Sequence, residues 1–192
     1  MSKRKKKTFL KLFIKIFNYF FRKIFKNKTP KLPEFLFLVG TAFFPQMNVE
    51  LIIRFKNKKT LYLWRDDEFG NNGWHLPGGI IRPNENINKR IKEVLLEETN
   101  LSPKWIKVYG PISFSEIIYS IPKIRSHFNS LVYLIEVSSH KINIQELKND
   151  ENTLITKKIP NNLIDNHKRY IGLLKKETSI LKRNKLKISK SI

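Results

Sequence analysis

The sequence contains no cysteine among its 192 residues, which excludes a disulfide framework and a thiolate metal site. It also lacks an uninterrupted apolar run of about 20 residues, which a transmembrane helix would need. No apolar stretch with a small-residue cleavage site indicates a secretory signal. The missing cysteine fits a reducing compartment, so we predict a cytoplasmic protein. A hydrophobic content of 41% predicts one globular domain with extensions.

Acidic residues are scarce, because 16 Asp and Glu stand against 38 Lys and Arg, a formal net charge of +22. Most of the excess lies at the ends: residues 1–29 carry +11 and residues 166–192 carry +8. A nucleic-acid protein would more often carry its basic patch on the folded domain. We therefore expect no specific nucleic-acid partner, although a protein that binds nucleic acid through its basic ends is the third alternative. The basic ends instead indicate tethering.

Residues 8–26 are predicted to form an amphipathic helix. At about 100° per residue, its polar positions fall in one narrow stripe opposite a wide face of phenylalanine and isoleucine. The stripe comprises Lys11, Lys15, Asn18, Arg22 and Lys26. Such a helix suits the interface of an anionic membrane, so we predict peripheral association with the inner face of the membrane. Docking of this helix on the domain or on a partner chain is the alternative, and a homodimer is left open.

Beyond a proline-containing linker at residues 28–33, runs rich in β-branched and aromatic residues predict strands. The predicted strands cover residues 35–44, 48–57, 59–65, 105–120 and 128–137, with a basic loop at 121–127. An apolar pattern of helical period predicts a helix near residues 87–101 and another over residues 161–182. This order of elements predicts a sandwich of helices and strands. We divide the chain into a basic extension and linker (1–33), a folded domain (34–165) and a basic C-terminal helix or tail (166–192).

The stretch from Leu76 to Leu101 holds the candidate chemistry. A Pro-Gly-Gly turn is predicted to lead through a polar loop into a short helix that ends in Glu97 and Glu98. Gly78 and Gly79 have no side chains, so the backbone and a ligand can approach each other closely there. Carboxylates crowded at a helix end are tolerated because a cation lies between them or because solvent screens them. Oxygen ligands of this kind suit Mg²⁺ or Mn²⁺.

The spacing of these residues resembles the Nudix box: a glycine, five residues, a glutamate, seven residues, then Arg-Glu-apolar-any-Glu-Glu-any-Gly-apolar. The matching residues are Gly79, Glu85, Glu97 and Glu98, with the apolar positions Leu95 and Leu101. Glu93, Val94 and Asn100 depart from the pattern, which has arginine, glutamate and glycine at these positions. Asparagine tolerates a left-handed helix cap, so the last change is mild. The nearest branch in pattern is the GDP-mannose mannosyl hydrolases, which also lack the glutamate at position 94.

The resemblance implies an α+β fold of Nudix type, an α/β/α sandwich with a mixed sheet. It implies a metal-dependent hydrolase, using Mg²⁺ or Mn²⁺, of a nucleoside diphosphate linked to another group, with an NDP-sugar as the predicted substrate. The predicted metal ligands are Gly78, Glu97, Glu98 and Asn152, where Asn152 follows Asp150-Glu151 as an amide does in the mannosyl branch. The predicted substrate-binding residues are Arg65, Trp74 and Arg82, although a core tryptophan is equally compatible with the sequence. Gly79 and Glu85 are assigned structural roles in the box.

The general base is where this chain departs most from the mannosyl branch. That branch has a histidine where this chain has Thr153, and threonine cannot act as a base at neutral pH. His127 is the candidate replacement, with Arg65 as the other predicted catalytic residue, whereas His75 is expected to pack. Attack by water at phosphorus and attack at the sugar carbon both fit the sequence. The alternative function is a Nudix-fold nucleotide-binding module that has lost turnover and is tethered to a membrane surface.

Overall fold

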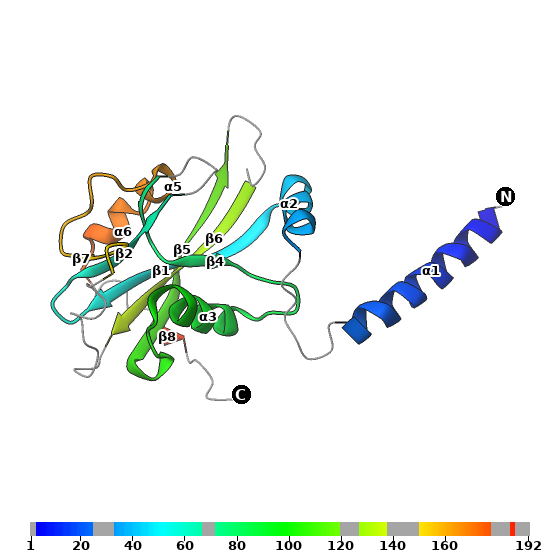
Figure 1. The fold of residues 1–192 in the computed structure, drawn as a ribbon, viewed down its shortest axis with the longest axis horizontal. Helices are drawn as coiled ribbons and strands as arrows, with labels where there is room; N and C mark the ends of the chain where they lie inside the picture. Colours follow the sequence, from blue (N-terminus) through cyan, green and yellow to red (C-terminus); the bar gives the residue numbers. More distant parts are fainter. Residues whose placement is uncertain are drawn as a thin grey trace. The chain divides into compact units, whose positions relative to one another are not determined.

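The structure, a computed structural model, describes residues 3–24, 33–66, 72–119, 127–137, 150–177 and 185–186. The chain divides into two compact units, residues 1–32 with 82–84 and residues 33–81 with 85–192. In the first unit, α1 (Lys3–Ile24) confirms the predicted N-terminal helix (Figure 1). Its described side chains, from Leu10 to Phe20, are exposed. Among the helices that the structure describes, none is both long enough and apolar enough to cross a membrane.

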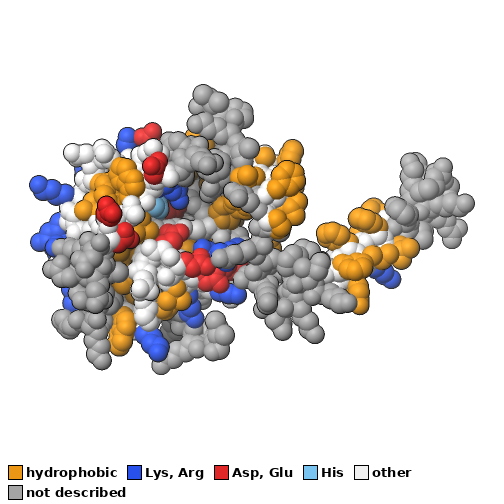
Figure 2. Space-filling view, in the orientation of Figure 1, with side chains coloured by type: hydrophobic (Ala, Val, Ile, Leu, Met, Phe, Trp, Pro, Cys, Tyr) orange, Lys and Arg blue, Asp and Glu red, His pale blue; other side chains and the backbone are white. Residues whose placement is uncertain are grey.

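The second unit begins with α2 (Glu34–Phe43), where the sequence analysis predicted a strand over residues 35–44. That prediction was wrong because the run is apolar on all sides and has no period that separates strand from helix. Pro33 immediately precedes the helix, and Phe44 returns to extended backbone before the first strand. Much of α2 remains exposed, including Phe35 at 74% and Phe43 at 76%. Figure 2 shows these hydrophobic side chains gathered over α2.

Within the described residues, eight strands form one mixed sheet in the order β3-β2-β1-β6-β5-β8, with β4 paired to β1 and β7 paired to β2. The strands are β1 (Gln46–Phe55), β2 (Thr60–Arg65), β3 (Gly73–His75), β4 (Gly78–Ile80), β5 (Ile106–Ile118), β6 (His127–Val137), β7 (Thr153–Thr156) and β8 (Lys185–Leu186). β1 and β6 run parallel, and the other described pairs of strands are antiparallel. The strands predicted over residues 48–57, 59–65, 105–120 and 128–137 are confirmed. The predicted Pro-Gly-Gly turn is instead the start of β4, because Gly78 and Gly79 pair with β1.

β1 lies at the centre of the core, and its residues 48–55 are all buried. Val49, Leu51 and Ile53 pack against α3 (Ile87–Thr99), the helix predicted near residues 87–101. Ile52 packs in a second cluster, with residues that include Leu163, Tyr170 and Leu174 of the C-terminal segment. Because side chains alternate along a strand, the even-numbered residues of β1 share the face of Ile52.

Polar side chains and backbone define both ends of α3. Asn86 accepts a hydrogen bond from the Lys89 backbone N–H at 2.8 Å and so caps the first turn. Asn100 adopts the left-handed conformation (φ 52°, ψ 22°), and the Leu101 N–H reaches back to the Leu95 carbonyl at 3.0 Å. The expectation that asparagine tolerates the cap at position 100 is therefore confirmed. A short 3₁₀ turn, η1 (Pro103–Trp105), then leads into β5.

The helix predicted over residues 161–182 is replaced by two short helices, α5 (Asp165–Lys168) and α6 (Ile171–Lys175). Residues 178–182 lie outside the described part of the chain. The residues before α5 cannot be helical because Trp74 of β3 exchanges backbone hydrogen bonds with Asn162 and Ile164. α3 covers one face of the sheet, and α5 and α6 cover the other (Figure 1). The predicted α+β class with a mixed sheet between helices is thus confirmed.

Candidate active site

Gly78 on β4 lies next to two carboxylates from different elements. Its N–H donates a hydrogen bond of 3.1 Å to Oε2 of Glu98, in the last turn of α3. In the β1–β4 pair it lies opposite Glu50, and a Cβ at position 78 would lie only 2.6 Å from Oε2 of Glu50 and 2.7 Å from the Val49 carbonyl oxygen. Only glycine permits this approach. The local fold thus brings Glu98 and Glu50 to one point of the backbone.

Burial raises the pKa of Glu98 from 4.5 to about 7. The hydrogen bond from Gly78 opposes this change, the charge of Glu50 adds to it, and the guanidinium groups of Arg65 and Arg90 oppose it. The positive charge of Arg65, which ends β2, therefore acts on the carboxylate that the sequence predicted as metal ligand. Burial lowers the pKa of His75 to about 3, helped by Arg65, so His75 is neutral. It packs in the interior and contacts the Leu63 carbonyl oxygen through Nδ1 at 2.8 Å.

The raised pKa of Glu98 predicts that the protein without metal loses stability as the pH rises. The folded state binds this proton more tightly than the unfolded state, so the free energy of unfolding falls between about pH 4.5 and pH 7 and then levels off. A pKa difference of this size corresponds to roughly 3 kcal/mol. The lowered pKa of His75 acts in the opposite direction between about pH 3 and pH 6.5.

The test compares urea denaturation of the unaltered chain and of Glu98→Gln in EDTA at pH 5 and pH 8. His75 is common to both, so the difference between the two chains isolates Glu98. Glu98→Gln should be more stable than the unaltered chain at pH 8 and nearly equal to it at pH 5. A difference that does not change with pH would contradict the prediction.

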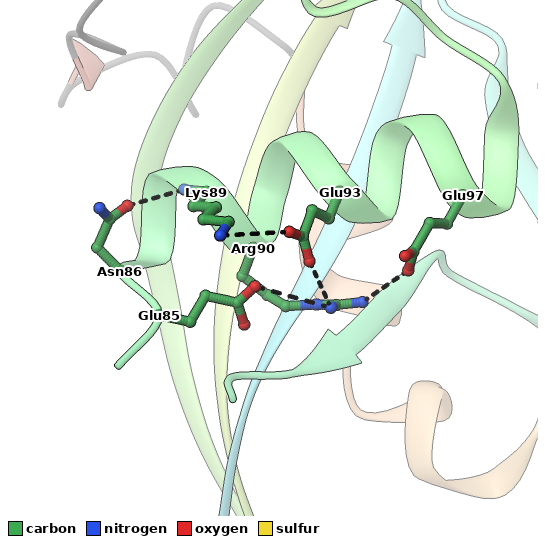
Figure 3. A network of polar contacts seen from close by, with 6 residues as sticks. All are labelled: Glu85, Asn86, Lys89, Arg90, Glu93 and Glu97. Carbon is green, nitrogen blue, oxygen red and sulfur yellow. Dashed lines mark hydrogen bonds and ion pairs between the residues drawn. The ribbon is translucent and has the colours of Figure 1, made fainter. Parts of the chain in front are cut away.

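The Arg90 guanidinium contacts three other acidic residues of this region (Figure 3). The Arg90 side chain is only 5% exposed; its Nη1 lies 3.2 Å from Glu93 Oε2 and 3.9 Å from Glu85 Oε1, and its Nη2 lies 3.5 Å from Glu97 Oε2. Gly79 makes room for Arg90, because a Cβ there would lie 2.7 Å from Nε and Nη2. Glu97 therefore faces Arg90, whereas its neighbour Glu98 faces Gly78.

The other predicted site residues lie elsewhere. Trp74 on β3 packs against the second core cluster and meets Trp64 edge to face at 5.2 Å. Asn152 is exposed; its backbone oxygen accepts from Trp64 N and its N–H donates to Asp150. His127 is the first residue of β6 rather than part of a loop, and its Nε2 lies 3.0 Å from Glu116 Oε1.

Arg82 is half-buried and follows β4 by two residues. The described contacts thus bring Gly78, Glu98 and the charge of Arg65 together, and none of them joins Asn152 or His127 to this group.

Sequence reasoning missed a buried polar cluster on β1. Asn48 Nδ2 donates to Glu50 Oε1 at 2.8 Å, and Ser130 Oγ donates to Asn48 Oδ1 at 3.0 Å. His167 Nε2 lies 3.4 Å from Glu50 Oε2. We call Asn48, Glu50, Ser130 and His167 the β1 polar cluster. Asn48 and Glu50, which alternate with apolar residues in the predicted strand, were the available signal for it.

The donor set can be compared with what a divalent ion requires. Within the described ranges, no three His, Cys, Asp or Glu side chains are grouped so as to hold a metal ion. Two carboxylates, Glu98 and Glu50, nevertheless lie beside the bare backbone of Gly78. Mg²⁺ is usually bound by one or two carboxylates together with water and substrate phosphates. The residues present therefore fit Mg²⁺ rather than a metal held entirely by protein side chains.

No protein-family model matches the chain. It is 37% identical over 76 residues to the RNA pyrophosphohydrolase of Pasteurella multocida (strain Pm70), a match that covers 40% of this chain and 36% of that protein. The chain thus matches about a third of the length of this curated relative. Among solved structures, Shewanella oneidensis NrtR aligns with a TM-score of 0.50 and 18% identity over 67% of this chain and 61% of that chain.

A bifunctional NMN adenylyltransferase/ADP ribose pyrophosphatase from Francisella tularensis aligns with a TM-score of 0.50 and 19% identity, over 73% of this chain and 43% of that chain. The chain therefore has a fold of the Nudix type, as these two solved structures do. The stretch that resembles the box runs from Gly79 on β4 through the loop and α3 to Leu101.

The stretch that resembles a Nudix box carries an arginine about one helical turn before the position where the pattern has one. The pattern places arginine at position 93, where this chain has Glu93, but Arg90 lies three residues earlier and contacts Glu93 itself. The same guanidinium also contacts Glu85, the first glutamate of the box. The spacing of Arg90 and Glu93, i and i+3 on one helix, is a sequence signal that would have predicted this pair.

Proposed function

We propose that this chain is a Mg²⁺-dependent Nudix hydrolase of a nucleoside diphosphate derivative. The observation that carries the proposal is the buried Glu98 carboxylate, held by the Gly78 N–H within reach of the charge of Arg65. A bound divalent ion would neutralise the diphosphate and stabilise the leaving group. Glu98 and the carbonyl oxygen of Gly78 are the residues that would hold the ion. Arg65 would contact phosphate oxygens through its planar fork of donors.

An NDP-sugar is the proposed substrate class, because the box lacks the same glutamate as the mannosyl branch. The similar proteins include an RNA pyrophosphohydrolase and an ADP ribose pyrophosphatase, so RNA and ADP ribose should also be tested as substrates. The assay should therefore cover NDP-sugars, ADP ribose, dinucleoside polyphosphates and a 5′-triphosphorylated RNA, each with and without Mg²⁺. Hydrolysis of one class only in the presence of the ion supports the proposal.

Isotope labelling distinguishes the two possible points of attack. In H₂¹⁸O, attack at phosphorus places the label in a phosphate product, whereas attack at the sugar carbon places it in the released sugar. Arg65→Lys keeps the charge but loses the planar fork, so it should raise KM more than Lys58→Met, an exposed control.

The alternative is a nucleotide-binding module without turnover. Two features favour it: Glu97 is engaged with Arg90, and Thr153 offers no base. ADP or NDP-sugar binding measured by calorimetry, together with no product from any substrate in the panel, would establish the module and exclude the hydrolase.

We also propose that residues 1–33 tether the folded domain to the inner face of an anionic membrane. On α1, Phe13 and Phe17 are 56% and 57% exposed and stack on each other at 6.3 Å. The lysine stripe of the same helix suits lipid head groups. The second unit adds the exposed apolar surface of α2, including Phe35 and Phe43. Exposed apolar patches of this kind usually mark a binding surface.

Membrane binding predicts that the full chain co-sediments with vesicles that contain anionic lipid and much less with neutral vesicles. The double substitution Phe13→Glu and Phe17→Glu should reduce pelleting at least about tenfold, because charge replaces the apolar face. A chain that begins at Leu32 should pellet as weakly as the double variant. Equal pelleting of all three chains would exclude α1 as the tether.

A further inference from the structure

Glu50 is a buried carboxylate in the middle of the central strand. Its side chain is 9% exposed and shares the face of β1 that packs against the C-terminal segment. Burial of a carboxylate is costly unless it is paired or hydrogen-bonded. Both oxygens of Glu50 have polar neighbours, Asn48 on Oε1 and His167 on Oε2. The fold therefore holds this carboxylate in one orientation.

The tautomer of His167 follows from its two neighbours. The Leu76 N–H donates to Nδ1 of His167 at 2.8 Å, so this nitrogen carries no proton. In the neutral ring the proton is then on Nε2, the nitrogen that lies 3.4 Å from Glu50 Oε2. Asn48 is oriented in turn by Ser130, whose hydroxyl donates to its amide oxygen. Neutral donors thus position Glu50 and leave other lone pairs of its two oxygens available.

The Tyr170 hydroxyl is a further buried polar group beside this cluster. The Tyr170 side chain is 2% exposed, and its hydroxyl has no hydrogen-bond partner. The Tyr170 ring lies beside His167, with the two ring centroids 5.5 Å apart, so this side chain borders the β1 polar cluster. A buried donor without an acceptor is rare and suits a site completed by a ligand oxygen.

We propose that Glu50 is a second carboxylate ligand of the divalent ion, across Gly78 from Glu98, and that Asn48 and His167 are its positioning residues. This inference rests on the proposed function. Glu50 reaches the candidate site beside Gly78. Because Gly78 has no side chain, Oε2 of Glu50 lies next to its backbone, and the N–H of the same residue donates to Glu98. The Tyr170 hydroxyl would donate to an oxygen of the bound phosphate. Glu50 lies outside the box, so its spacing to Glu98 gave no sequence signal.

Binding of Mn²⁺ alone to the full chain tests the proposal without any assay of activity. Electron paramagnetic resonance measures unbound Mn²⁺ during titration of the unaltered chain, Glu50→Gln, Glu98→Gln and the exposed control Glu177→Gln. Glu50→Gln and Glu98→Gln should each weaken the Kd at least about tenfold, whereas Glu177→Gln should leave it unchanged. Thermal melts in EDTA establish that each variant folds. If Glu50→Gln does not fold, Glu50→Asp keeps the charge on a shorter side chain and should also weaken the Kd.

The positioning role of His167 has its own pair of variants. His167→Gln retains an N–H that can reach Glu50, whereas His167→Leu does not. Mn²⁺ affinity should fall about tenfold in His167→Leu and recover in His167→Gln, a rescue that a purely structural role would not produce.

Unchanged Mn²⁺ affinity in folded Glu50→Gln, with affinity lost in Glu98→Gln, would overturn this inference and leave the proposed hydrolase intact. An unaltered chain that neither binds Mn²⁺ nor hydrolyses any substrate would overturn both.

Discussion

Glu98→Gln is expected to lower kcat/KM for the hydrolysed substrate at least about 100-fold. Glutamine has nearly the same shape and can still accept the Gly78 N–H, so the local backbone should persist. The negative charge is lost, and with it the strongest reason for a divalent ion to bind beside the diphosphate. Steady-state kinetics over a range of Mg²⁺ concentrations provides the measurement.

The matched control is Glu177→Gln, because Glu177 is exposed and forms an ion pair with Lys58, which is also exposed. Its kinetics should equal those of the unaltered chain. High Mg²⁺ should restore part of the activity of Glu98→Gln if the loss is one of ion affinity. A Glu98→Gln chain with full activity at low Mg²⁺ would rule out Glu98 as a ligand.

Arg54→Met is expected to lower the free energy of unfolding by about 3–5 kcal/mol. Arg54 is 5% exposed, and its guanidinium donates at 2.6 Å to the carbonyl oxygens of Leu174 and Lys176 and at 3.3 Å to that of Leu173. The Leu174 and Lys176 carbonyls lie at the C-terminal end of α6, where backbone carbonyls lack helical partners. Burial lowers the pKa of Arg54, but arginine remains charged. Methionine fills a similar volume and leaves these two carbonyls without the guanidinium donor, whereas the Leu173 carbonyl keeps the Lys176 N–H.

Urea denaturation followed by circular dichroism measures this loss. Lys58→Met is the control, because it removes an exposed ion pair with Glu177 and should change stability by less than about 1 kcal/mol. Arg54→Lys should fall between the two, since an ammonium reaches fewer of the carbonyls. Equal stability of Arg54→Met and Lys58→Met would show that the C-terminal segment is held by its apolar contacts alone.

Local sequence patterns were sufficient where neighbouring residues decide the structure. Runs rich in β-branched and aromatic residues predicted β1, β2, β5 and β6, and the resemblance to the box placed Gly78 close to Glu98. Asn100 was read correctly as a left-handed cap from its side chain alone. These features depend on a few adjacent residues, so they can be read without knowledge of the tertiary structure.

The failures have a common physical cause. Residues 35–44 are apolar without a period, so tertiary context decides between strand and helix. Residues 162–164 are extended because they pair with Trp74, which no local pattern reveals. The contact of Glu50 with His167 joins segments far apart in the sequence. The Arg90–Glu93 pair could be read from its i, i+3 spacing, whereas the contacts of Arg90 with Glu85 and Glu97 depend on how the loop and the helix fold together.

The placement of Glu50 and Arg54 on one face of β1 has a consequence for the order in which the protein is completed. Both partners come from residues 165–177, which a ribosome synthesises long after β1. A nascent or proteolysed chain that lacks this segment leaves Glu50 without His167 and Arg54 without its carbonyl acceptors. Completion of the candidate site therefore depends on a segment that is synthesised more than a hundred residues after β1.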